Sequence, residues 1–187
     1  MSHPSKIETL LQLLDDPNQQ AASLIMAELL DDENEDQLDF YLAQLQESPD
    51  PLLRRRVHQL ESVIFMRRRR RDFAEKLQKN ELALIDGLVE IHLQWYDNDT
   101  PESIYEDWRK VLNEAGKNPP ENIEKLAYLM RKMGYSVPPP NDLQADYYCI
   151  GTLLDESVGA DVLLCALAQM LAAEWGLELQ IIQVMEN

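Results

Sequence analysis

The stretch "GADVLLCALAQMLAAEWGLELQIIQV" (residues 159–184) decides how the C-terminal part of the chain folds. Its run of Leu and Ala predicts a helix over residues 161–175, which Gly176 ends as a C-cap. The next segment, "LELQIIQV" (177–184), alternates as a strand does. Cys165 falls within the predicted helix, so the first question is whether its thiol is a nucleophile or a small core side chain.

The rest of the chain is predicted to be mostly helical. Only 6 of the 187 residues are Gly, and the strong helix formers Leu, Ala, Glu and Gln dominate. In the first 50 residues, apolar side chains recur at helical spacing between the turns "DDPN" (15–18) and "SPDP" (48–51). These turns lie about 32 residues apart, and the pattern resembles that of HEAT-type repeats. Two copies are too few to be stable alone, so we expect them to pack on the helices that come after them in the chain.

Helix signals continue towards the C-terminus. Thr100 is a good N-cap residue, Pro101 suits the first helical position, and Gly134 predicts a C-cap. The segment "VPPPND" (137–142) cannot be helical. We expect a mainly α fold with at most one or two short strands, in which a HEAT-like helical region over residues 1–80 precedes a second helical region over 81–187, with helices at 51–79 and 81–96.

Charge is distributed unevenly along the chain. The formal net charge is −17, which argues against general binding to nucleic acid or to anionic membranes. Residues 52–79, however, hold eight Arg and two Lys against three carboxylates, a balance of +7, so the remainder carries −24. This basic segment is the main candidate for a functional surface that the sequence offers without reference to any family.

The arginine run "FMRRRRRDF" (65–73) has three interpretations. The arginines could pair within the chain with the acidic segment at residues 29–39, bind an acidic partner or phosphates, or bind nucleic acid, which the net charge disfavours. The turn "WYDNDTPESIYEDW" (95–108) gathers aromatic residues, for core packing or for a partner pocket. The candidate partner-binding residues are Arg54, Arg55, Arg56, Arg67, Arg68, Arg69, Arg70, Arg71, Trp95 and Trp108.

Compartment and cofactor signals are few. The N-terminus shows no apolar segment with a cleavage site, and no apolar run approaches the length of a membrane-spanning helix. Cys149 and Cys165 have neither the number nor the spacing of a disulfide framework or a metal site. We therefore expect a cytoplasmic protein that uses no metal, no cofactor and no membrane.

From about residue 81 to 184 the pattern resembles a bacterial SirB-type family with a transglutaminase-like core. The resemblance rests on "ELALIDGLVEIHLQWY" (81–96), on the stop "MGY" (133–135), and on the glycine that leads into the Leu/Ala-rich helix ending "GL" before the predicted strand. It implies HEAT-like helices packed on a helical body, followed by the first strand of a transglutaminase-like sheet.

The catalytic residues that this resemblance implies do not match. In transglutaminase-like enzymes the nucleophilic Cys lies two residues after the glycine, where this chain has Asp161, a residue suited to an N-cap. Cys165 lies one turn further on, among apolar neighbours, which predicts a core side chain. The later strands that carry the family's His and Asp are missing, and no His follows His92. The resemblance therefore implies a truncated relative without the catalytic residues.

The expected function is that of a non-catalytic interaction or scaffold protein with a protein partner. Residues 177–184 would form a lone edge strand, so pairing with a second copy is one option for that partner. Two alternatives remain open. One is a cysteine-dependent amide-hydrolysing or amide-transferring enzyme that uses Cys165 or Cys149, and the other is a phosphate or nucleic-acid binder that uses the arginine residues.

Overall fold

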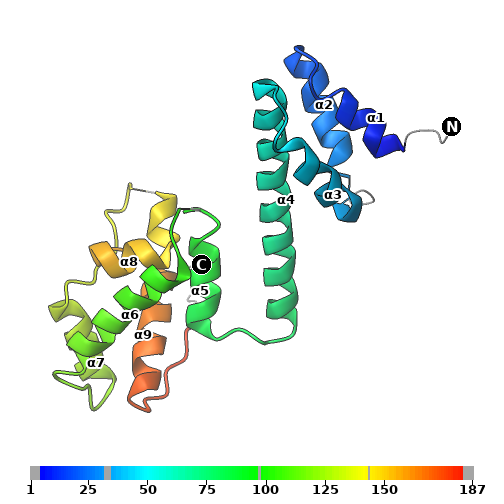
Figure 1. Cartoon of the computed structure of the whole chain (residues 1–187). Coiled ribbons are helices and arrows are strands. Elements are labelled where there is room, and N and C mark those ends of the chain that lie inside the picture. Colours follow the sequence, from blue (N-terminus) through cyan, green and yellow to red (C-terminus); the bar gives the residue numbers. More distant parts are fainter. Residues whose placement is uncertain (1–4, 32–34, 97, 143, 183–187) are drawn as a thin grey trace, which may run out of the picture. The chain divides into compact units, whose positions relative to one another are not determined.

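The computed structural model describes residues 5–31, 35–96, 98–142 and 144–182, and they form a mainly α fold, as predicted. Within these residues, β pairing is limited to one isolated parallel bridge between Ser136 and Val158. The chain divides into two compact units, residues 1–74 and 75–187. The division falls within the last turns of a long helix (Figure 1).

The first unit contains the short helices α1 (Lys6–Gln12), α2 (Gln19–Leu29) and α3 (Glu35–Leu45) and most of the long helix α4 (Pro51–Gln78) (Figure 1). Local caps begin the first two helices. Ser5 and Glu8 form a capping box on α1, and the Asn18 side chain accepts two backbone N–H groups of α2. The core of this unit consists of Ile7, Leu11, Leu14, Leu29, Leu38, Leu42, Val57, Leu60 and Ile64.

Arg56 is a buried charged residue of the first unit, with only 6% of its surface exposed. Its guanidinium donates to the carbonyl oxygens of Leu14 and of Asp16, the latter at 2.6 Å. Both carbonyls lie just beyond the C-terminal end of α1, where backbone acceptors lack helical partners. Arg56 therefore ties α4 to the "DDPN" turn, and burial of this charge is offset by charge-assisted hydrogen bonds.

The second unit is built from α5 (Leu84–His92), α6 (Pro101–Ala115), α7 (Ile123–Lys132), a 3₁₀ turn η2 (Ala145–Tyr148), α8 (Ile150–Glu156) and α9 (Asp161–Glu174). α8 packs on α5 and α6, while α9 packs on α5 and α7. The core includes Val89, Leu93, Ile104, Trp108, Leu126, Ile150, Leu153, Leu167 and Leu171.

The predicted caps of this unit are present. The Thr100 hydroxyl accepts the Ser103 N–H at 3.3 Å, and Pro101 is the first residue of α6. Gly134 and Gly176 have φ of +91° and +67°, and the N–H groups around each bond back to the last turn of α7 and of α9 as in a Schellman motif. None of the described helices has both the length and the apolar character needed to cross a membrane.

Three local predictions were wrong. Residues 177–182 are not a strand: Leu177 and Leu179 pack on the core, and the Gln169 amide donates to the Leu179 carbonyl. Residues 183–184 of the predicted strand lie outside the described residues. The helix expected over 81–96 is shorter, because α5 begins at Leu84 and ends at His92.

The third correction concerns the start of α9. Ala160, not Asp161, is the N-cap residue. Asp161 is the first helical residue, and its carboxylate accepts the N–H of the adjacent Val162 at 2.7 Å. A carboxylate in the first turn still interacts favourably with the helix dipole.

Replacing Arg56 with Met should lower the free energy of unfolding of the first unit by about 2 to 4 kcal/mol, because two carbonyl groups would lose a charged donor. Urea unfolding followed by circular dichroism should show an early transition. The three tryptophans all lie in the second unit, so the urea midpoint followed by tryptophan fluorescence should be nearly the same in the variant and the native chain.

The matched control is Arg55→Met, since the Arg55 side chain is exposed on the same helix. Its effect should stay within about 0.5 kcal/mol. Equal stability of the two variants would show that the Arg56 hydrogen bonds contribute nothing to folding.

Candidate functional site: an acidic cleft beside a buried histidine

The second unit contains a cleft of about 640 Å³ bounded by the end of α5, the start of α6, η2 and α8. Its wall is strongly acidic. Among the described residues that line it there is no Lys and no Arg. The lining carboxylates are Asp99, Asp107, Asp146, Asp155 and Glu156.

Packing of α8 on α5 and α6 brings these carboxylates together from distant parts of the chain. Asp99 immediately precedes the N-cap of α6, and Asp155 and Glu156 end α8. One cation is adjacent: Lys110 pairs with Asp107 at 2.6 Å. No group of three His, Cys, Asp or Glu side chains within the described ranges is placed to hold a metal ion.

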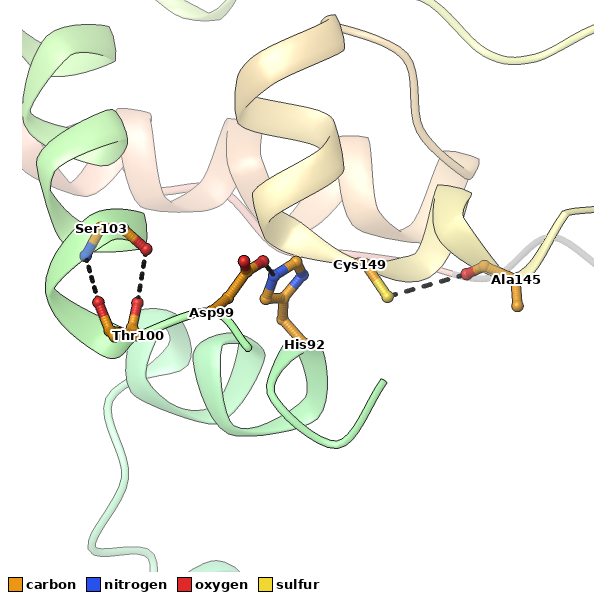
Figure 2. A network of polar contacts seen from close by, with 6 residues as sticks. All are labelled: His92, Asp99, Thr100, Ser103, Ala145 and Cys149. Carbon is orange, nitrogen blue, oxygen red and sulfur yellow. Dashed lines mark hydrogen bonds and ion pairs between the residues drawn. The ribbon is translucent and has the colours of Figure 1, made fainter. Parts of the chain in front are cut away.

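His92, the last residue of α5, lies against the cleft with only 2% of its surface exposed. Its Nε2 is 2.8 Å from Oδ2 of Asp99, whose side chain is 47% exposed (Figure 2). The imidazole also stacks on Tyr96, with ring centroids 4.8 Å apart. Since a carboxylate can only accept, Nε2 carries the proton in this bond, and His92 holds Asp99 in a fixed position.

The other ring nitrogen of His92 has no partner. Nδ1 is buried and forms no hydrogen bond. A Cβ built on Gly151 would lie 2.5 Å from Cε1 of His92 and 3.1 Å from Nδ1. The first turn of α8 thus reaches the ring only because residue 151 lacks a side chain. Nδ1, the nitrogen that a general base would use, is buried.

Two tyrosines that line the cleft, Tyr96 and Tyr147, bind the carboxylates of Asp146 and Asp142. A hydrogen bond to Asp146 is the main cause that raises the pKa of Tyr96, and burial adds to it. The Tyr147 hydroxyl donates to Oδ2 of Asp142 at 2.6 Å, which lowers the pKa of the Asp142 carboxyl. Each bond fixes the position of its carboxylate, and the bond to Asp142 also favours the ionised form of that group.

The structure contradicts the expectation for Cys165. Cys165 was predicted to be a core residue, but it is exposed on α9. The buried thiol is that of Cys149, the N-cap residue of α8, which makes a weak contact of 4.0 Å with the Ala145 carbonyl (Figure 2). Burial first, and then the charge of Asp146, raises the pKa of the Cys149 thiol, which disfavours the thiolate that nucleophilic catalysis needs.

Part of the arginine run contacts the acidic segment, as one interpretation predicted. Arg67 donates to the Leu30 carbonyl, and Arg68 pairs with Asp39 at 2.8 Å. Residues 32–34 of that acidic segment lie outside the described residues. Arg69 and Arg71 also interact with other residues of the chain.

The remaining candidate residues have different environments. Arg56 is buried in the first unit, and Arg54 donates to the Ser48 carbonyl. Arg55 and Arg70 are exposed on α4. The two tryptophans do not form a common surface, because Trp108 lies in the core of the second unit whereas Trp95 is 65% exposed.

Comparison with known proteins gives no relative. No family model matches the chain, and no curated protein or solved structure is significantly similar to it.

Replacing Gly151 with Ala should destabilise the second unit by about 1 to 3 kcal/mol, because the added methyl group overlaps the His92 ring. In an unobstructed helix the same change stabilises by roughly 0.5–1 kcal/mol. The sign of the change in unfolding free energy therefore shows whether the methyl group meets the ring. Urea unfolding followed by tryptophan fluorescence measures the effect.

A double-mutant cycle isolates the contact. In a His92→Ala background, Gly151→Ala should cost nothing or stabilise, which gives a coupling energy of at least about 1 kcal/mol. An additive double variant would refute close packing between α8 and the imidazole.

In the native protein, iodoacetamide should label Cys165 and leave Cys149 unmodified until the chain unfolds, because one side chain is exposed and the other is buried. Raising the pH should promote labelling of Cys149 only above the range of an ordinary thiol, since its pKa is raised. Site-resolved mass spectrometry provides the readout. Rapid native labelling of Cys149 at neutral pH would contradict the structure and favour a cysteine enzyme.

Proposed function

We propose that the chain is a non-catalytic protein-interaction module and that its acidic cleft binds a basic segment of a partner protein. The observation that carries this proposal is the composition of the cleft: five carboxylates line it without an arginine or lysine among the described lining residues. A hollow with walls of one charge concentrates the potential within it and attracts ligands of the opposite charge.

The geometry suits guanidinium and ammonium groups on a flexible segment. The five carboxylates come from four parts of the chain, the loop before α6, α6, η2 and α8, so several cationic side chains can each bind a different carboxylate. His92 holds Asp99 in position, and Tyr96 holds Asp146. These two side chains therefore lose less conformational entropy when a ligand binds. Asp155 and Glu156 are exposed, which leaves them accessible to a ligand.

The placement of the nucleophile candidates supports a non-catalytic role. A cysteine-dependent enzyme needs a thiol and a base that reach the substrate. The Cys149 thiol and Nδ1 of His92 are both buried, and Cys165 lies on α9, which contributes no residue to the cleft. The presence of Asp161 at the position expected for a transglutaminase-like cysteine supports the same proposal.

Binding of a fluorescein-labelled pentaarginine peptide to the full chain, measured by fluorescence anisotropy, tests this function. The double variant Asp155→Asn/Glu156→Gln should weaken binding about tenfold, because two exposed carboxylates of the cleft lose their charge. Higher salt should weaken binding to the native chain more than binding to the variant.

The matched control is Glu174→Gln/Glu178→Gln, which removes the same charge from exposed positions outside the cleft. It should leave the affinity nearly unchanged. An equal loss in both double variants would mean that net charge, and not the cleft, attracts the peptide, and the proposal would fail.

A further inference from the structure

A second hollow of the same unit differs in charge from the acidic cleft. It encloses about 450 Å³ between the loop after α6, with Pro119 and Pro120, and one face of α7. A hollow of about 370 Å³ adjoins it and shares Asn118, Leu129 and Lys132 with it. We call the two together the α7 groove.

The α7 groove is basic, although the second unit is otherwise acidic. Its lining contains four lysines and two glutamates, whereas the whole chain has twice as many acidic as basic residues. Lys117 pairs with Glu114, and Lys110 pairs with Asp107. Among the described residues, no carboxylate pairs with Lys125 or Lys132, so the charges of these two lysines are available to a ligand.

These two lysines flank an exposed aromatic ring. Lys125, Tyr128 and Lys132 follow one another at intervals of three and four residues, so they share one face of α7. The Tyr128 side chain is 63% exposed. Lys125 and Lys132 are exposed as well, so the ring and both charges are accessible together on this face.

Apolar side chains form the floor of the groove. Leu129, Val111 and Leu154 are buried beneath it, and Met133 packs against the same core. Burial raises the pKa of Tyr135, which also lines the groove, to about 12, so its hydroxyl adds no negative charge near neutral pH. The groove thus combines an apolar floor with basic walls, and the two prolines stiffen one side.

We propose that the α7 groove binds an acidic segment of a partner protein, which places carboxylates on Lys125 and Lys132 and an apolar side chain against Tyr128 and the floor. Charge complementarity selects an acidic occupant, and the apolar floor selects a peptide over a polyphosphate backbone, which offers no apolar side chain. The proposal does not depend on the acidic cleft. With both sites, the second unit would hold two partners of opposite charge.

The probe for this proposal is a fluorescein-labelled peptide in which pairs of glutamates alternate with a single phenylalanine or leucine. It should bind the full chain at physiological ionic strength. The variant Lys125→Glu/Lys132→Glu should weaken binding at least about tenfold, and Lys125→Arg/Lys132→Arg should retain it. Tyr128→Ala should weaken binding about threefold to tenfold through loss of the apolar contact.

The matched control for net charge is Lys76→Glu/Lys79→Glu. It changes the net charge by the same amount as Lys125→Glu/Lys132→Glu, but at exposed positions outside the groove. This variant should bind like the native chain, and all variants should keep the native circular dichroism spectrum. An equal loss of peptide affinity in the two Lys→Glu variants would overturn the proposal. So would an affinity of the native chain for the peptide weaker than millimolar, or tighter binding of a short oligothymidylate than of the peptide.

Discussion

The contact between His92 and Gly151 is the constraint on which the second unit depends. An imidazole ring fills the space where any other residue at position 151 would place its Cβ, and this lets α8 close on the end of α5. Because α8 also carries Asp155 and Glu156, the same contact places their carboxylates in one cleft with Asp107 of α6. One close approach of backbone to side chain therefore determines both the packing and the acidic wall of the cleft.

The buried ring has an energetic cost that its other contacts offset. An unpartnered Nδ1 costs about 1–3 kcal/mol, against which stand the bond to Asp99, the stack on Tyr96 and the apolar packing around them. A side chain held in this way is suited to positioning a carboxylate. It is poorly suited to proton transfer, because the nitrogen that has no hydrogen-bond partner is buried.

The elements that local chemistry specifies could be predicted from the sequence. Thr100 with Pro101, and the glycines at 134 and 176, place helix ends where the structure has them. α9 shows where periodicity fails, because nearly all of its residues are apolar. Its buried stripe is Leu163, Ala166, Leu167, Met170 and Leu171, and Cys165 lies outside this stripe. Without a polar face, the sequence offers no way to decide which side of the helix is buried.

The cleft itself could not have been predicted. Its residues come from segments up to 64 positions apart, from His92 to Glu156, and their proximity depends on how α5, α6 and α8 pack. The sequence gives only a weak signal for the site, namely that His92 and Asp99 lie on either side of the turn before α6. The prediction of a strand at 177–184 was wrong over 177–182 for a related reason. The alternating apolar residues Leu177 and Leu179 pack on the core without pairing as a strand.

The most direct test of a cleft organised around His92 is a long-range ¹H–¹⁵N spectrum of the histidine rings in the full chain, recorded with and without the pentaarginine peptide. We predict that neutral His92 carries its proton on Nε2, and that its ring signals shift when the peptide binds. The signals of His58, which is exposed on α4 in the first unit, should stay unchanged. A His92 ring protonated on Nδ1, or one that does not respond to bound peptide, would contradict this organisation of the cleft.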